Sequence, residues 1–218
     1  MPAVLGYWDI RGLAQPARLL LHYVGQEFED KRYETGPAPD FNKDSWNNEK
    51  FSLELPFPNL PYFKDGDSKI VQSNAIMRSI ARKHNLCGTT EDEMVKCDIM
   101  ENQSMDFRNG FVRLCYSPDY ETLRPEYLKS LPATLKLLSD FLGENPWFAG
   151  KNLTFVDFIM YELLDQHRMF EPTCLDDHKN MRDFLDRFEA LPAIKKYMKS
   201  EQFSKWPVNN KMAKWGGN

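Results

Sequence analysis

The chain has 218 residues, of which 42% are hydrophobic, and carries a formal net charge of −4 with both signs spread along its length. This length suffices for one large hydrophobic core or two smaller ones, and the mixed charge argues against a nucleic-acid partner. No apolar run approaches the roughly 18 residues of a membrane span, and residues 1–20 do not resemble a signal peptide, so we expect a cytoplasmic protein without membrane association.

The cysteines and histidines, four of each, show no spacing typical of redox or metal chemistry. The cysteines form no CxxC pair, and reduced thiols are therefore the expected state of all four. The histidines share no HxxxH spacing, and the sequence contains neither a GxSxG motif nor a glycine-rich phosphate loop. We expect no metal site, no serine hydrolase and no nucleotide site.

The first third of the chain alternates short apolar runs with helical periodicity. Residues 4–8 (VLGYW) predict a strand, apolar residues between Leu13 and Val24 predict a helix that ends at Gly25, and Phe28–Tyr33 predicts a second strand. Residues 35–41 (TGPAPDF) predict a loop. Two further strands are expected at Leu60–Lys64 and Lys69–Gln72, followed by a helix over 74–84 with Ser73 as its N-cap.

Long helical patterns dominate from Glu91 onward. One apolar helix side is marked by Met94, Cys97, Ile99, Met100 and Met105. Thr154 and Asp157 match a capping box, with Leu153 and Phe158 in the staple positions, and the apolar run over 155–164 predicts a central buried helix. We therefore expect an α/β domain over 1–84, a linker over 85–90 and an all-α domain over 91–218.

Tyr7 and Trp8 end the first strand, where a thiol redox protein of this architecture would carry a CxxC motif. By position alone, a tyrosine at a strand end is more often a core or surface residue than a catalytic one. Pro61 stands at the start of a strand, where a cis bond is possible and a trans edge proline is the commoner interpretation.

Two further groups could bind an anion. Gln72 and Ser73 lie where a strand passes into a helix, and the free N–H groups of a first helical turn attract a carboxylate or phosphate; Ser73 could equally serve only as a cap. Lys43, Trp46 and Lys50 are spaced by three and four residues, which would bring them to one face of a helix. Such charges are usually a solvated face, although the tryptophan N–H could donate to the same anion.

Several motifs in order resemble the mu-class cytosolic glutathione transferases: LGYWDIRGLAQPARLLL, SWNNEKF, FPNLPY, QSNAIMRSIARKH, MENQSMD, LCY, ENPWFAG and TFVDF. The resemblance runs from Pro2 to about Met198. It implies a homodimeric detoxification enzyme that conjugates reduced glutathione to hydrophobic electrophiles, with glutathione as a cosubstrate and no cofactor. It also implies a thioredoxin-like N-terminal domain that binds glutathione and an all-helical C-terminal domain that forms the electrophile pocket and part of the dimer interface.

The resemblance assigns roles to individual residues. Tyr7 is expected to donate to the glutathione sulfur and Tyr116 to the electrophile or its leaving group. Asp106 is expected to reach the glutathione site from the neighbouring subunit. Ten further residues of this subunit are expected to line or contact that site: Trp8, Leu13, Lys43, Trp46, Lys50, Asn59, Leu60, a cis Pro61, Gln72 and Ser73. Phe57, Arg78 and Arg82 are expected at the dimer interface, with Asp98 or Glu101 as partners of the arginines.

The electrophile pocket is the least transferable part of the resemblance. Ile10, Arg108 and Val112 are expected to border it, together with a tail in which Asn209 and Asn210 lie near positions where relatives often have a larger apolar side chain or serine. Lys43 stands where many family members have arginine, which reduces bidentate recognition of a carboxylate to a point charge. The alternative is a non-catalytic ligand-binding or structural protein on the same scaffold, and an isomerase with the same site is a third interpretation.

Overall fold

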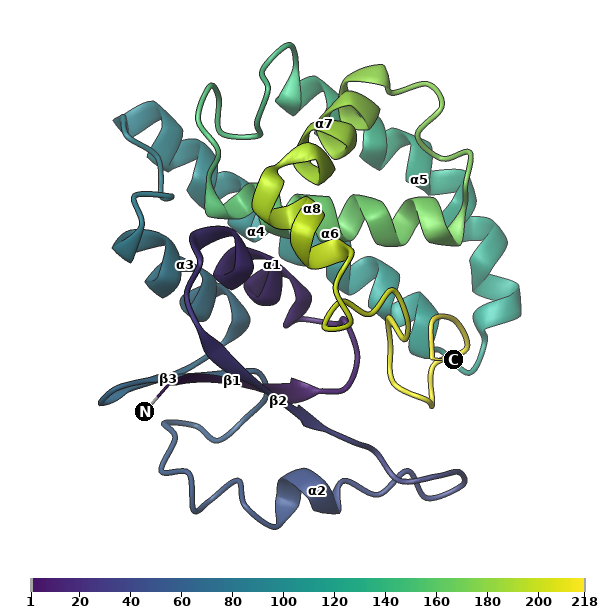
Figure 1. The fold of residues 1–218 in the computed structure, drawn as a ribbon. Helices are drawn as coiled ribbons and strands as arrows, with labels where there is room; N and C mark the ends of the chain where they lie inside the picture. The colour runs from purple at the N-terminus through teal and green to yellow at the C-terminus, as the bar shows by residue number, and fades with distance from the viewer. Residues whose placement is uncertain (1, 218) are drawn as a thin grey trace. The chain divides into compact units, whose positions relative to one another are not determined.

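The computed structural model describes residues 2–217 (Figure 1). Its elements, in chain order, are β1 (Ala3–Trp8), α1 (Gln15–Val24), β2 (Phe28–Tyr33), α2 (Asp44–Asn47), β3 (Tyr62–Asp65), β4 (Ser68–Val71), α3 (Ser73–Lys83), α4 (Glu91–Tyr116), α5 (Tyr120–Leu142), α6 (Phe155–Phe170), α7 (Lys179–Ala190) and α8 (Pro192–Met198). An α/β part followed by an all-helical part is the predicted fold class, and the element order confirms it. No helix within residues 2–217 is long and apolar enough to cross a membrane.

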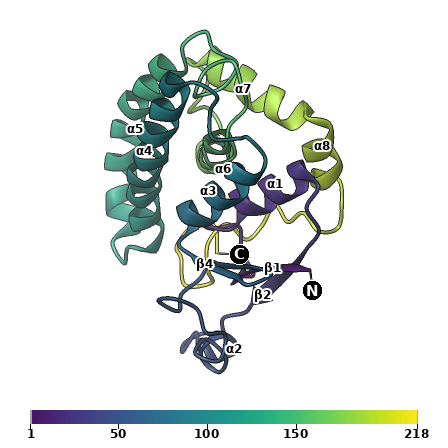
Figure 2. The ribbon, with the colours of Figure 1, turned by 90° about the vertical axis from the view of Figure 1, so that its left-hand side faces the viewer.

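The described residues form two compact units, one made of residues 2–80 together with 196–217 and the other of residues 81–195. The first unit contains a four-stranded sheet in the order β2-β1-β3-β4, in which β1 is parallel to β2 and antiparallel to β3. Helices α1 and α3 lie on one face of this sheet and α2 lies on the other (Figures 1 and 2). The residues after α8, 199–217, form no helix or strand; we call them the tail.

Most of the predicted elements of the first unit are present. β2 has the predicted bounds, and Gly25 ends α1 in the left-handed conformation, at a φ of 71°. The predicted bounds of the other elements were wrong by one or two residues, at the starts of β1 and α1 and at both ends of β3, β4 and α3. β3 begins after Pro61, which has no N–H for the ladder, and β4 ends before Gln72, whose φ of 73° is incompatible with a strand.

The second unit is built from α4 to α7, with α4 and α5 side by side (Figure 2). The capping box of α6 is confirmed, because Asp157 accepts hydrogen bonds from the N–H and the hydroxyl of Thr154 at 2.7 and 3.1 Å. α6 is buried on nearly all sides, as its apolar sequence predicts. The apolar side predicted for α4 is wrong in part, since Cys97 and Met100 are buried whereas Met94 and Ile99 are exposed.

Candidate functional site

The sheet topology brings the predicted site residues of the first unit to the end of the sheet at which β1 finishes. Tyr7 lies at the end of β1, and the antiparallel register that pairs Gly6 with Tyr62 places Pro61 opposite Tyr7 when it is extended by one residue. β4 pairs Tyr62 with Val71, so Gln72 leaves the sheet at this same edge. The parallel strand β2 also ends there and leads into the segment that contains α2. Residues from four separate stretches of chain therefore converge at the carboxyl end of β1.

Tyr7 is buried, with 5% of its surface exposed, and its hydroxyl oxygen accepts a hydrogen bond of 3.1 Å from the backbone N–H of Leu13. A tyrosine hydroxyl can accept and donate at the same time, so its own hydrogen can still be directed at a ligand. Accepting one bond also polarises the O–H group and makes it a stronger donor. This geometry suits a group that stabilises a negative charge.

Gly12 keeps the space beside the Tyr7 hydroxyl open. Its φ is 43°, in the left-handed region, and a Cβ atom at this position would lie 2.7 Å from the Tyr7 hydroxyl oxygen. Both the backbone conformation and the short approach require glycine. The sequence places a glycine here without revealing this reason, because the approach depends on how the turn after β1 folds back.

Leu60 and Pro61 form a cis peptide bond, as the resemblance implies and against the commoner trans form. Leu60 is buried, and its N–H donates to the side-chain oxygen of Asn59 at 2.9 Å. Asn59 thus holds the backbone group that is expected to pair with the cysteinyl unit of the ligand. Displacing Asn59 from the Leu60 N–H would make that donor available to a peptide ligand.

Gln72 is exposed and adopts a φ of 73°, which is uncommon for a residue with a side chain. α3 begins immediately after it at Ser73, and the Gln72 carbonyl accepts from Ile76 N at 3.0 Å. The N–H groups of the first turn of α3 therefore lie next to Gln72. A ligand carboxylate at this end of the sheet would meet those donors.

Trp46 is held against the sheet by two tyrosines. Its ring centroid lies 6.0 Å from that of Tyr62 in a stacked arrangement and 5.3 Å from that of Tyr33 in an edge arrangement, and the two tyrosine hydroxyls are 2.9 Å apart. The segment is also fastened by an ion pair of 2.7 Å between Lys31 on β2 and Glu49. Trp46 is consequently buried and fixed in orientation.

The two lysines beside Trp46 are less constrained. Backbone bonds of 2.8 Å from Asn47 to Lys43 and of 3.0 Å from Lys50 to Trp46 make this segment helical, although α2 itself covers only four residues. Lys43 is exposed, and the Lys50 ammonium lies 4.8 Å from the centre of the Phe51 ring. Both ammonium groups can move toward an anion near Trp46.

Asp106 and Tyr116 belong to the second unit, on α4. Asp106 is exposed, as a residue that reaches another subunit must be, and Tyr116 is half-buried at the last position of the helix. Arg108 and Val112 lie between them on α4, whereas Ile10 is a buried residue of the first unit. The expected catalytic pair, Tyr7 and Tyr116, therefore comes from both units.

The two asparagines of the tail have different environments. Asn209 is 4% exposed, its side-chain amide donates to the Trp215 carbonyl at 3.0 Å, and its backbone N–H donates to the Gly216 carbonyl at 2.7 Å. It therefore folds the tail back on itself. Asn210 is half-buried. The sequence pattern around these residues gave no sign that Asn209 closes a loop.

The described part of the chain contains neither a disulfide nor a cluster of metal-binding side chains. None of the four cysteines, all within the described residues, forms a disulfide, and two of them, Cys97 and Cys115, are buried. Residues 2–217 contain no group of three or more histidine, cysteine or acidic side chains arranged to hold a metal ion.

Comparisons with known proteins match both units. Residues 3–82 match the family model described as glutathione S-transferase, N-terminal domain, and residues 105–201 match glutathione S-transferase, C-terminal domain. The chain is 57% identical over 216 residues to Glutathione S-transferase Mu 1 of Bos taurus, with 99% of each chain covered. It is 58% identical over 213 residues to Glutathione S-transferase Mu 3 of Homo sapiens, with 98% of this chain and 95% of that protein covered.

Solved structures give the same result. The glutathione S-transferase Blo t 8 superposes with a TM-score of 0.90 at 36% identity, covering 98% of this chain and 99% of the other. The pi-class glutathione S-transferase of Onchocerca volvulus superposes with a TM-score of 0.86 at 33% identity, covering 98% and 100%. The fold and the sequence therefore agree on one family.

Proposed function

The chain belongs to the mu class of the glutathione S-transferases, and from this premise we propose that Tyr7 stabilises the thiolate of glutathione bound at the carboxyl end of β1. The enzyme conjugates glutathione, its cosubstrate, to electrophiles and uses no separate cofactor. The observation that carries the proposal for Tyr7 is the hydrogen bond that its hydroxyl accepts from Leu13 at 3.1 Å, which makes the hydroxyl a stronger donor.

The energy required of Tyr7 is within the reach of one hydrogen bond. A cysteine-like thiol has a pKa of ~8.5, and lowering it by about two units requires roughly 2.7 kcal/mol of preferential thiolate stabilisation. A hydrogen bond to a charged group contributes about 1.5 to 3 kcal/mol. Tyr7 thus acts on the nucleophile of another molecule and is not itself the nucleophile.

The rest of the site holds the two ends of the tripeptide. Trp46, Lys43 and Lys50 bind the glycyl carboxylate, a role that the fixed ring of Trp46 and the exposure of Lys43 support. Gln72 and Ser73 bind the γ-glutamyl end at the start of α3, and Leu60 pairs with the cysteinyl unit. Trp8, Leu13, Asn59 and Pro61 line the same edge of the sheet.

The electrophile is bound and activated by the second domain. We assign residues 1–84 to the glutathione-binding domain, 85–90 to the linker and 91–218 to the domain that shapes the electrophile pocket; within the last range, residues 196–217 cluster with the first unit. Tyr116 donates a proton to the electrophile or its leaving group, so its contribution depends on the substrate. Arg108 and Val112, both on α4, border the pocket on this domain. A non-catalytic carrier on this scaffold has no observation in its favour.

The enzyme works as a homodimer in the cytoplasm, where it detoxifies electrophiles. Phe57 is 86% exposed and adopts a φ of 51°, a conformation that is strained for an aromatic residue, and insertion into a partner subunit would bury its ring. Arg78 and Arg82 meet acidic residues near the two-fold axis, and the partner's Asp106 completes the glutathione site. Four cysteines without a disulfide suit a reducing compartment.

Replacement of Tyr7 tests this proposal directly. Tyr7→Phe should lower kcat/KM for an activated chloronitrobenzene at neutral pH by at least about tenfold, which corresponds to ~1.4 kcal/mol. Tyr23→Phe removes a hydroxyl from α1 and serves as the matched control. Unchanged turnover in a folded Tyr7→Phe enzyme would rule out the role given to Tyr7.

A further inference from the structure

The turn that joins β1 to α1 has an acceptor for every backbone N–H from residue 9 to residue 13. The acceptors are the Tyr33 carbonyl for Asp9 at 2.8 Å, the Trp8 carbonyl for Ile10 at 2.7 Å, the Pro207 carbonyl for Arg11 at 2.9 Å, the Val208 carbonyl for Gly12 at 3.1 Å and the Tyr7 hydroxyl for Leu13 at 3.1 Å. The last of these bonds is the one that polarises Tyr7. The conformation of the turn therefore decides whether the Leu13 N–H points at the Tyr7 hydroxyl.

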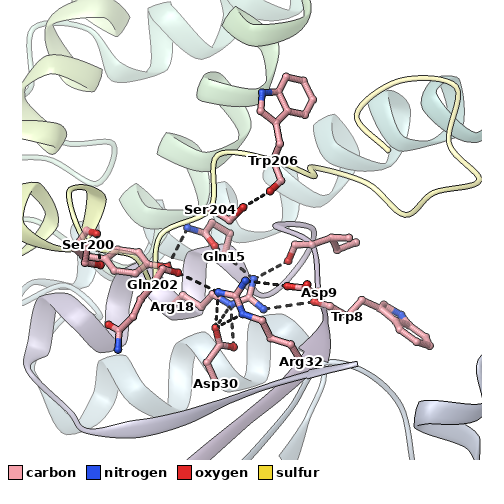
Figure 3. Close-up of polar contacts among 12 residues, drawn as sticks. Trp8, Asp9, Gln15, Arg18, Asp30, Arg32, Ser200, Gln202, Ser204 and Trp206 are labelled. Atoms are coloured by element: carbon pink, nitrogen blue, oxygen red, sulfur yellow. Dashed lines mark hydrogen bonds and ion pairs between the residues drawn. The ribbon is translucent and has the colours of Figure 1, made fainter. Parts of the chain in front are cut away.

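A buried guanidinium holds the carbonyl side of this turn. Arg18 is 1% exposed and donates to the Ile10 carbonyl at 2.7 Å, to the Trp8 carbonyl at 3.5 Å and to both oxygens of Asp30 at 3.0 Å (Figure 3). A buried cation needs a paired anion and several acceptors to offset its lost hydration. Asp30 supplies the anion, and the turn supplies the carbonyl acceptors.

Asp30 is shared by a second guanidinium. The Arg32 side chain lies 2.8 Å from the Asp30 carboxylate, donates to Asp9 at 2.9 Å and donates to the Gln202 carbonyl at 3.1 Å (Figure 3). Arg32 therefore connects the first residue of the turn to the tail. Because one carboxylate orients both arginines, Asp30 is the residue on which this cluster depends.

The tail holds the turn from its N–H side through backbone carbonyls. The Gln202 carbonyl accepts from the Arg32 side chain, and the Lys205 carbonyl accepts from the Arg11 side chain. The Pro207 carbonyl accepts from the Arg11 N–H, and the Val208 carbonyl accepts from the Gly12 N–H. The Val208 side chain is fully buried, and the two hydrogen bonds of Asn209 close the following loop. Asn209 thereby fixes the residue whose carbonyl meets Gly12.

We propose that Asp30 and Asn209 are positioning residues for catalysis, which fix the turn after β1 so that the Leu13 N–H is directed at the hydroxyl of Tyr7. The inference rests on the proposed role of Tyr7 and deepens it. Neither residue touches the thiol: Asp30 acts through Arg18 and Arg32, and Asn209 acts through the Val208 carbonyl. The C-terminal tail is then part of the machinery that lowers the pKa of the glutathione thiol.

A purely structural role makes a different prediction. If the cluster only stabilises the fold, its loss would lower the melting temperature without changing the thiol pKa of glutathione bound to the folded enzyme. If it positions Tyr7, its loss raises that pKa, and the effect requires the Tyr7 hydroxyl. A double-mutant cycle with Tyr7→Phe separates these cases.

The experiment uses the full-length enzyme with saturating glutathione, at a temperature at which circular dichroism shows every variant folded. The pKa of the bound thiol is read from the ultraviolet absorbance of the thiolate as the pH is raised. Asp30→Asn and Asn209→Ala should each raise it by ~0.5 to 1 unit, which leaves about three- to tenfold less thiolate below the pKa. Glu29→Gln makes the same charge change at an exposed neighbouring site and should leave the pKa unchanged.

In the Tyr7→Phe background, the same substitutions should shift the thiol pKa no further. The inference is overturned if both variants keep the wild-type thiol pKa, or if they raise it equally with and without the Tyr7 hydroxyl. If Tyr7→Phe alone leaves the thiol pKa unchanged, the proposed role of Tyr7 fails as well. Should Asp30→Asn not fold, Asp30→Glu, which retains the charge on a longer side chain, and Asn209→Ala provide the measurement.

Discussion

The backbone N–H of Leu13 donates to the hydroxyl oxygen of Tyr7 at 3.1 Å. Tyr7 is the last residue but one of β1 and Leu13 lies in the turn before α1, so this bond closes the turn onto the side chain that is proposed to face the thiol. A hydroxyl that accepts such a bond donates more strongly.

Gly12→Ala should damage the site more than it damages the fold. The new Cβ atom would lie 2.7 Å from the Tyr7 hydroxyl, and the φ of 43° would cost a residue with a side chain about 1 to 2 kcal/mol. Thermal unfolding and kcat/KM measure the two effects. Gly66→Ala is the matched control, because its φ is 60° and a Cβ there meets no atom within 4 Å. Both variants should lose stability, and only Gly12→Ala should lose more than about tenfold in activity.

Lys43→Arg should tighten glutathione binding, because a planar guanidinium can bind the glycyl carboxylate through two parallel hydrogen bonds. Lys43 is exposed, so the gain should be small, about two- to fivefold in Kd, in line with the 0.2–1 kcal/mol of a surface ion pair. Isothermal titration calorimetry measures it, with Lys69→Arg on β4 as the control. Equal affinities for Lys43→Arg, Lys43→Ala and the wild type would remove Lys43 from the carboxylate site.

Phe57→Ala should dissociate the dimer. Burying an aromatic ring contributes about 1.5 to 3 kcal/mol, and a two-fold dimer contains two copies of the contact. The dissociation constant of the dimer should therefore rise by at least about 100-fold. Sedimentation equilibrium measures the change. Phe51→Ala is the control, since its ring is also exposed, at 74% against 86% for Phe57. A dimer that tolerates Phe57→Ala as well as it tolerates Phe51→Ala would contradict the proposed interface.

His167 should make the second unit sensitive to acid. Its Nδ1 lies 2.6 Å from the Leu163 carbonyl, which can only accept, so Nδ1 carries the proton and Nε2 accepts from the Tyr127 hydroxyl at 2.7 Å. Burial, partly opposed by the hydrogen bond to Leu163, lowers the pKa of His167 to about 4. The folded state therefore binds fewer protons than the unfolded chain between pH 6.5 and 4, and stability falls as the pH falls through this window.

The expected loss is about 3 kcal/mol as the pH falls through this window, because the folded-state pKa of about 4 lies well below the unfolded value of 6.5. Urea unfolding followed across this range measures it. In His167→Phe this contribution to the pH dependence should disappear, whereas replacement of the exposed His84 by glutamine should leave the slope unchanged. A pH dependence that is the same in wild type and His167→Phe would show that His167 does not titrate on unfolding.

The sequence was most informative where periodicity and turn residues specify local structure. β2 and the capping box of α6 were predicted with their correct residues, because alternation and capping depend on neighbours in the chain. The buried stripe of α4 was obscured by Ser104, a polar residue within it, and the exposed Met94 and Ile99 were assigned to the wrong side. The left-handed conformation of Gln72 has no local signal, so the end of β4 was misplaced.

Part of the candidate site could likewise be predicted from the sequence, and part could not. Tyr7 and Pro61 lie at strand ends, so a correct strand order brings them together, and the resemblance supplies their roles. The contact between Arg11 and the Lys205 carbonyl spans 194 residues and uses a backbone acceptor, which leaves no pattern in the side chains. For the same reason, a tail expected only to line the electrophile pocket proved to hold the turn that carries Leu13.

The most direct test of the central claim is the pKa of the glutathione thiol bound to wild type and to Tyr7→Phe, measured from thiolate absorbance as a function of pH. In the wild type this pKa should lie about two units below the ~8.5 of a free cysteine-like thiol. In Tyr7→Phe it should rise by at least about one unit while glutathione still binds, because the donor to the sulfur is lost. An unchanged pKa in a folded, glutathione-bound Tyr7→Phe enzyme would contradict the account.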